Sequence, residues 1–293
     1  MLKGRLGLET ARIPQADRHG VVWLRRGNLY VESGTLRFVT AGDDEVGPGD
    51  YAIPFQMASC LVLQPGTTVT HDSLRLLHRH GTGLVFTGQD GVRFYASLPA
   101  GPDSARRARR QATAWADPDE RTRIARRMFE WRMGEPTDVR DLDALRGIEG
   151  SRMKEIYRQL AAEYGVPWRG RRYDRGKPES ADVVNQAINH AASAVEGLAL
   201  TAVAVTGTIP QLGFIHEDPG QSFVLDVSDL FRDSVLLPVA FSAAGEVLRE
   251  KRGPIERAVR YRAGDTFRRE RVIVEMIGRI KELFDADDGG SDA

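Results

Sequence analysis

The sequence predicts an α+β protein in which a small, sandwich-like β-sheet domain precedes a larger all-α domain. Short β-branched and aromatic runs, separated by turn residues, fill residues 20–97, whereas alanine, arginine, leucine and glutamate dominate from Ala105 onward. The 293 residues also reach the length, about 250–300, at which one hydrophobic core tends to split. We expect the β domain at 1–98, a linker at 99–104, the helical domain at 105–284 and a disordered acidic tail at 285–293.

Six short apolar runs predict the strands of the first domain. Asp90 and Gly91, which both tolerate a positive φ, lie between the last two runs and predict a β-hairpin. Thr70 is suited to cap a short helix between the strands, with Leu74 and Leu77 facing inward. The six runs are residues 21–24, 29–31, 36–39, 60–63, 84–87 and 92–96.

Apolar residues at helical spacing predict the long elements of the second domain. Those between Leu142 and Tyr164 recur every three to five residues, and this helix should end before Gly165. Ser180 is expected to cap a second helix. Residues 223–239 and 265–284 supply two further helices.

Composition excludes several classes of protein. A hydrophobic content of 41% excludes wholesale disorder. The single cysteine, Cys60, excludes an internal disulfide framework and a cysteine-based zinc cluster, so we expect a reducing, cytoplasmic location. We expect no targeting signal, and no apolar stretch reaches the roughly 20 residues that span a bilayer.

Charge is balanced overall but uneven along the chain. The 41 basic residues equal the 41 acidic ones, yet segments 105–132, 146–177 and 249–271 are each strongly basic and rich in arginine. Such segments are typical of solvated helix surfaces. They are equally typical of a phosphate-binding surface, because an arginine fork grips a phosphate through two hydrogen bonds. Composition alone leaves both interpretations open.

Glu149 is an acid at the edge of an apolar helical stripe. It lies four residues after Leu145 and four before Met153. A carboxylate there loses hydration and needs a partner. A salt bridge to Arg146 or Arg152 would supply one, and this is the simplest interpretation of Glu149 taken alone.

A second acidic group follows in the apolar segment 223–230. Asp226 and Asp229 lie three residues apart, so they share a helical face, and two like charges on a buried face need a cation between them. His216 precedes Asp226 by ten residues. Together with Glu149, these residues fit a hard divalent cation such as Mg²⁺ or Mn²⁺. Spacing alone leaves open whether the two helices meet.

Three blocks in order resemble the CRISPR-associated integrases of spacer acquisition, in a form similar to subtype I-E. The blocks are RGIEGSR at 146–152, GFIH at 213–216 and FVLDVSD at 223–229. The resemblance implies an N-terminal β domain, a helical catalytic domain, and metal ligation by Glu149, His216 and Asp229. It places Asp226 at the fourth acidic position of the catalytic site, where it could orient a metal-bound water or accept the proton of the nucleophile.

The same resemblance implies partners. It implies homodimers bridged by a small dimeric protein, and apolar β-domain edges such as residues 29–31 offer weak support for the dimer. The loop at 217–221 carries acids where relatives carry a lysine that reads the end of the incoming DNA. Positions that match DNA contacts in relatives are Arg75, Arg93, Arg171, Tyr173, Arg257 and Arg260.

The expected reaction is transesterification, in which the 3′-hydroxyl of a short duplex attacks a phosphodiester at the edge of a repeat. Two alternatives stay open. One is a metal-dependent nuclease that acts on branched DNA without an integration role. The other is a non-catalytic DNA-binding scaffold, whose acids form helix-surface salt bridges.

Overall fold

The computed structural model describes residues 18, 20–43, 45–98, 105–139, 141–172, 181–250 and 253–285. The predicted linker at 99–104 lies outside these residues, as does the predicted acidic tail beyond Asp285. Asp285 is among the described residues, and its carboxylate pairs with the buried Arg107 at 2.6 Å. The disordered tail stays a prediction.

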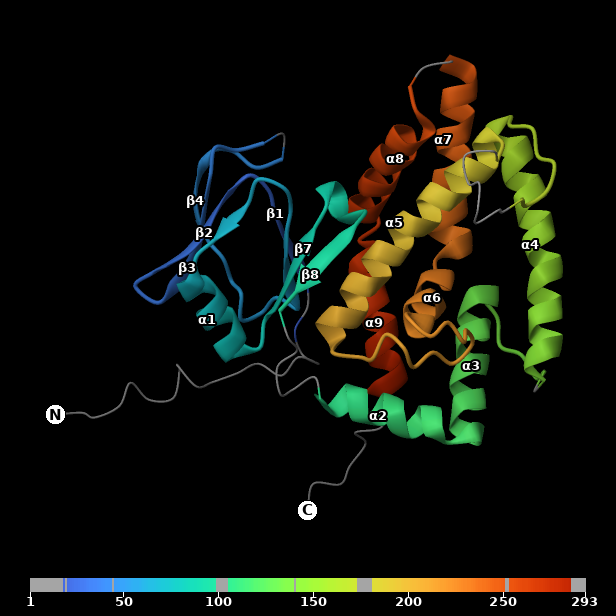
Figure 1. Ribbon diagram of the computed structural model, residues 1–293, viewed down its shortest axis with the longest axis horizontal. Coiled ribbons are helices and arrows are strands. Elements are labelled where there is room, and N and C mark those ends of the chain that lie inside the picture. The colour runs from blue at the N-terminus through green and yellow to red at the C-terminus, as the bar shows by residue number, and fades with distance from the viewer. Residues whose placement is uncertain are drawn as a thin grey trace.

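Two four-stranded sheets form the N-terminal region, which confirms the predicted sandwich-like layers (Figure 1). In the first sheet three strands run parallel and the last is antiparallel. The order in this sheet is β1 (Val21–Leu24), β5 (Cys60–Leu63), β7 (Gly83–Thr87) and β8 (Phe94–Ser97). The order in the second sheet is β4 (Gly49–Ala52), β3 (Thr35–Thr40), β2 (Gly27–Glu32) and β6 (Thr68–Val69).

Turn chemistry fixes the connections as predicted. Asp90 and Gly91 both have a positive φ, 59° and 75°, in the short 3₁₀ turn η2 (Gln89–Gly91) that joins β7 to β8. The Thr70 hydroxyl accepts the hydrogen bond of the Ser73 amide and caps α1 (His71–His80), whose Leu77 is buried. The strands β4 and β6 were not predicted, because one is rich in turn formers and the other has two residues.

The first sheet is buried on both faces. Leu61, Leu63 and Leu84 face the second sheet and α1 in one apolar cluster. The alternate residues, Cys60 and Val62 among them, belong instead to the core of the helical region. The β domain and the helical domain therefore share a core, although composition separates them clearly in the sequence.

The second sheet presents its edge through β4, not through the segment predicted from its apolar residues. Strand β2, which contains residues 29–31, pairs with β3 on one side and β6 on the other, and Leu29 is fully buried. The earlier support for a dimer edge at 29–31 is thus wrong, because an apolar run marks the inside of this sheet.

The helical region is built around α5 (Val183–Thr206), which packs on the first sheet and on four other helices (Figure 1). By length and composition α5 could cross a membrane, yet 56% of its apolar window is buried inside the protein, as in a core helix. The remaining helices are α2 (Ala105–Ala116), α3 (Pro118–Met133), α4 (Leu142–Tyr164), α6 (Ser222–Asp229), α7 (Leu237–Glu250), α8 (Ile255–Arg269) and α9 (Val272–Phe284), with the π turn η5 (Arg232–Leu236) before α7.

Helix boundaries agree with the sequence in α4 and differ in three others. Gly165 ends α4 in the left-handed conformation, as predicted. The cap of α5 is Asp182, whose side chain accepts from the Asn185 amide, while Ser180 lies outside the described residues. The predicted helix 223–239 breaks at η5, because Pro238 has no amide hydrogen to donate within a regular helix. The predicted helix 265–284 breaks at Arg271, where φ is 53°.

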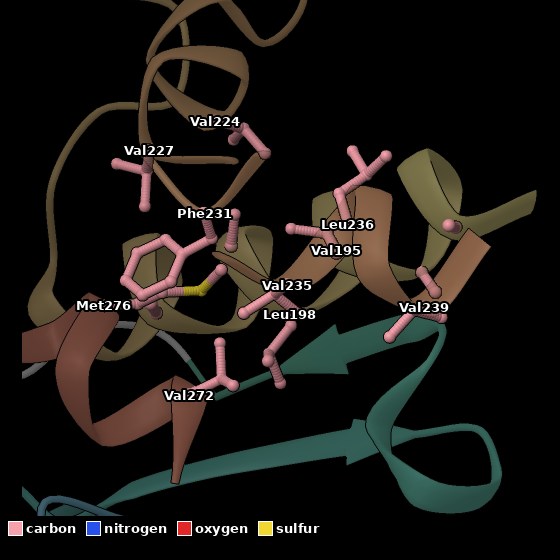
Figure 2. Close-up of a cluster of buried hydrophobic side chains, with 14 of the residues drawn as sticks. Val195, Leu198, Val224, Val227, Phe231, Val235, Leu236, Val239, Val272 and Met276 are labelled. Atoms are coloured by element: carbon pink, nitrogen blue, oxygen red, sulfur yellow. The ribbon is translucent and has the colours of Figure 1, made fainter. Parts of the chain in front are cut away.

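An apolar cluster beneath α6 fixes the rotation of this short helix. Figure 2 shows Val224 and Val227 directed toward Val195 of α5 and Met276 of α9, with Phe231 between them. Because these positions occupy one side of α6, Asp226 and Asp229 lie on the other. The apolar packing thus places Asp226 against the loop that precedes α6 and Asp229 toward α3.

Candidate active site

A cavity of about 360 Å³ collects the predicted ligand residues from three separate parts of the chain. Glu149 comes from the middle of α4, His216 from the loop before α6, and Asp229 from the end of α6. The two acidic segments, whose meeting the spacing alone left open, therefore lie around the same cavity. The other lining residues are Phe129, Arg132, Arg146, Gly150, Met153, Ile215 and Arg232.

Glu149 is largely buried on α4, and its partner is neither of the two arginines predicted for it. Its carboxylate contacts the guanidinium of Arg132, at the end of α3. Arg146 instead pairs with Asp143, and Arg152 pairs with Asp233. The neighbouring Gly147 and Gly150 leave open space beside the helix, since a Cβ at either position would contact nothing within 4 Å. No side chain at these two positions therefore covers the cavity beside Glu149.

Asp226 organises the loop before α6 and does not face the cavity. It is completely buried, and its two oxygens accept hydrogen bonds from the amides of Phe214, Ile215 and His216. One oxygen also lies 2.7 Å from Nδ1 of His216. With its acceptor positions occupied, Asp226 is not available to orient a bound water or to accept a proton from a nucleophile, the roles that we expected for it.

The contact with Asp226 determines how His216 presents its ring. A carboxylate only accepts, so Nδ1 of His216 carries the hydrogen and Nε2 is left with its lone pair when the ring is neutral. Nε2 points toward Asp229, whose Oδ2 is 3.6 Å away. The hydrogen bond to Asp226 raises the pKa of His216, against the opposing effect of burial, and the charge of Asp229 raises it further.

Asp229 is surrounded by positive charge. Its Oδ2 lies 3.3 Å from Nη2 of Arg132, and its Oδ1 lies 3.4 Å from Nη1 of Arg232. Arg232 is held in turn by the hydroxyl of Tyr157, at 3.2 Å. Within the residues that the structure describes, no three histidine, cysteine or acidic side chains form a ready metal cage. The carboxylates of Glu149 and Asp229 do not form such a cage, because the guanidinium of Arg132 lies between them and contacts both.

The donor set nevertheless suits a divalent ion in its chemistry. Two carboxylates and an imidazole nitrogen whose other nitrogen is held by a carboxylate form the arrangement that orients a metal-ligating histidine. Asp233, one turn beyond Asp229, is half-buried, and burial raises the pKa of its carboxyl group despite the opposing charge of Arg152. Asp233 thus belongs to an ion pair beside the site.

Sequence reasoning missed two charged residues that line this cavity. Arg132 had been considered only as a member of a basic segment, and Arg232 had not been considered at all. Glu196 of α5 does not line the cavity, although burial and then the charges of Asp229 and Asp218 raise the pKa of its carboxyl group. The signal for Arg132 was present, since it follows the buried Met128 and Phe129 by four and three residues and so shares their helical face.

The residues predicted to contact DNA lie in several places. Arg93 is exposed beside β8 and pairs with Glu256 of α8 at 3.0 Å, which brings it close to the exposed Arg257 and Arg260 on the same helix. Arg75 lies on α1, paired with Asp72.

Arg171 belongs to a separate region beside α5. It donates to the side chains of Asn185 and Asn189, the latter at 2.7 Å. Tyr173 lies outside the described residues. Three of the six residues predicted to contact DNA, namely Arg93, Arg257 and Arg260, therefore lie close together.

A β-sheet domain joined to a helical domain, with an acid on one long helix and a histidine and two aspartates around a short one, defines the class of CRISPR-associated proteins that the sequence blocks resemble. The chain belongs to the family described as CRISPR associated protein Cas1, whose sequence pattern matches residues 21–135 and 132–252.

Relatives in sequence and in structure agree with this assignment. The chain is 37% identical to the CRISPR-associated endonuclease Cas1 of Escherichia coli K12 over 94% of this chain and 87% of that protein. It is also 37% identical to the protein of the same description from Geobacter sulfurreducens, over 96% and 88%. A solved structure described as a TtCas1–DNA complex superimposes with a TM-score of 0.80 at 34% identity, over 92% of this chain and 97% of the other.

Proposed function

We propose that this protein is a metal-dependent DNA integrase and endonuclease of spacer acquisition. In this reaction the 3′-hydroxyl of a short duplex attacks a phosphodiester at the edge of a CRISPR repeat. The observation that carries the proposal is the meeting of Glu149, His216 and Asp229 in one cavity, from elements far apart in the sequence. Relatives over most of the chain are named endonucleases, which supports phosphodiester chemistry.

Glu149, His216 and Asp229 would hold the ion. Oxygen donors with one imidazole suit Mg²⁺ or Mn²⁺ better than softer metals. When bound, such an ion polarises a phosphodiester and lowers the pKa of an attacking hydroxyl.

Asp226 acts through His216, by holding Nδ1–H so that Nε2 faces the cavity. It is thus a positioning residue, and the other three residues would be the ligands of the ion.

The arginines of the cavity serve the phosphate. Arg146 and Arg232 line it, and their charge compensates the negative charge that a phosphodiester brings. Arg146 also lines a second cavity of about 720 Å³ on the side of Trp115 and Arg121, so the two hollows lie next to each other. A strand whose end reacts at Glu149 has room to continue there.

Double-stranded DNA is the proposed substrate, both as incoming duplex and as repeat. A relative of 34% identity has been solved as a DNA complex. Arg93, Arg257 and Arg260 form an exposed basic group at the joint between β8 and α8, suited to a phosphate backbone.

Joining both ends of an insert needs two sites at a fixed separation, which a symmetric assembly supplies. We propose a homodimer bridged by a small dimeric partner, as the family resemblance implies. The edge strand β4, with the exposed Val39 and Tyr51 nearby, offers a surface for the dimer.

The test is a joining assay with a labelled duplex, a plasmid that carries a repeat, and Mn²⁺ or Mg²⁺. We expect Glu149→Gln to lose joining and to retain DNA binding. The matched control is Glu155→Gln, on the same helix, whose carboxylate is exposed and pairs with Arg158 and Gln159 of α4. This variant should join like the wild type.

The assay also separates the two alternative functions. Cleavage of branched DNA that depends on Asp229, without any joined product, would indicate a nuclease and refute the integrase. Full joining by Glu149→Gln would refute the site. The absence of any metal-dependent reaction would indicate a scaffold.

A further inference from the structure

Arg132 occupies the centre of the proposed ligand set. One nitrogen of its guanidinium, Nη2, contacts the carboxylates of both Glu149 and Asp229. The side chain is 7% exposed, so these contacts are shielded from solvent. A guanidinium in this position satisfies the same two carboxylates that a divalent ion would need.

The surroundings of Arg132 hold both its backbone and its head group. It lies in the last turn of α3, where the helix dipole favours a cation, and its guanidinium lies 5.5 Å from the ring of Phe129. Its main-chain carbonyl accepts a hydrogen bond from Arg152. The head group itself is held by Glu149 and Asp229, and it borders the cavity of about 360 Å³ into which it could turn.

We propose that Arg132 and a divalent cation are alternative occupants of the position between Glu149 and Asp229. Two cations cannot share that position, because each would repel the other where both need the same oxygens. Arg132 therefore competes with the ion, keeps the two carboxylates paired when no ion is bound, and sets the affinity of the site. This inference rests on the proposed metal site and adds a control on its occupancy.

The competition changes the apparent affinity of the site for the ion by an amount that can be measured. The apparent dissociation constant of the ion equals the intrinsic one divided by the fraction of molecules in which Arg132 has turned away. If Arg132 holds the position in about nine-tenths of the molecules, its removal tightens ion binding about tenfold.

The experiment is a calorimetric titration of the full chain with Mn²⁺. The variants are Arg132→Gln, a charge-matched control Arg232→Gln, and Arg132→Gln combined with Asp229→Asn. Arg232 also contacts Asp229 but lies outside the pair formed with Glu149, so its removal changes the charge of the site by the same amount. Thermal unfolding in EDTA and in Mn²⁺ is recorded for each protein.

We expect Arg132→Gln to bind Mn²⁺ about tenfold more tightly than the wild type and more tightly than Arg232→Gln. Its unfolding temperature should fall in EDTA and rise more on addition of Mn²⁺ than that of the wild type. Equal affinities in Arg132→Gln and Arg232→Gln, or weaker binding in Arg132→Gln than in the wild type, would overturn the competition. If Arg132→Gln shows no Mn²⁺ binding that the added Asp229→Asn substitution abolishes, it is the proposed metal site that fails.

If Arg132→Gln does not fold, a second variant and a measurement on the wild type test the same proposal. Arg132→Met keeps an unbranched stem against Phe129 and removes the charge, so it should show the same tightening. In the wild type, a titration with Mg²⁺ followed by ¹⁵N NMR of the guanidinium groups needs no variant of the site to fold. The Arg132 signal should shift as Mg²⁺ binds, and an unchanged signal at saturation would overturn the proposal.

Discussion

Replacing Asp226 by asparagine should destabilise the protein far more than the loss of an ordinary surface charge. Asp226 is fully buried and accepts four hydrogen bonds, three from main-chain amides and one from His216. An asparagine turns one of the two acceptor oxygens into a donor, so about two of these bonds are lost. At about 1.5–3 kcal/mol for each bond to a charged group, the free energy of unfolding should fall by about 3–6 kcal/mol. The unfolding temperature should then fall by about 6–12 °C.

Urea unfolding followed by circular dichroism in EDTA measures this loss without a contribution from bound metal. The matched control is Asp233→Asn, one turn beyond α6, where burial already disfavours the charged carboxylate. We expect this control to cost less than about 1 kcal/mol. A loss in Asp226→Asn no larger than in the control would refute the view that Asp226 holds the loop.

Three further predictions follow from packing and titration. Gly264→Ala should lower the free energy of unfolding by about 1–3 kcal/mol, because its Cβ would meet Asp90 at 2.3 Å. Gly278→Ala has open space around it and should raise the free energy of unfolding by about 0.5–1 kcal/mol. Urea unfolding compares the two variants, and equal effects would contradict the reasoning. The pKa of His216 is raised above its usual 6.5 in the folded protein, so the stabilisation by protonated His216 is complete below pH 6.5 and is lost as the pH rises through the folded pKa. The free energy of unfolding of the wild type in EDTA should therefore fall over that pH range. An equally steep fall in Asp226→Asn would exclude His216 as its source. Burial raises the pKa of Cys60 to about 12. A thiol reagent at pH 8 should therefore react with Cys60 only at the rate at which the protein unfolds. Fast labelling of the folded protein would contradict this, because it would show that the thiol is accessible.

Much of the fold could be predicted because its signals are local. The spacing of apolar residues gave the bounds of α4, and the turn residues Asp90 and Gly91 gave the β7–β8 hairpin. The break at η5 had a local signal in Pro238, which has no amide hydrogen to donate, whereas the break at Arg271 depends on how α8 and α9 pack together. Strand β4 was missed because its pairing with β3, and not its composition, makes it a strand.

The candidate site was predicted in its members and not in its arrangement. Glu149, His216 and Asp229 do line one cavity, as the three sequence blocks indicated. The sequence could not show that Asp226 turns away to bind main-chain amides, because helical spacing places it on the same face as Asp229. It also could not show that Arg132 enters from α3, since that contact joins segments whose distance depends on the tertiary fold.

The double burial of the first sheet has a consequence for how this architecture can vary. Strands β7 and β8 of this sheet pack on α5, so the inner sheet and that helix must change together. A chimera that grafts the first 98 residues of a relative onto this helical half would bring foreign side chains against α5 and leave gaps or clashes along the seam. Swapping β2 to β4 of the outer sheet alone leaves that seam untouched, but the replacement must still pack on Leu61, Leu63 and Leu84 of the inner sheet.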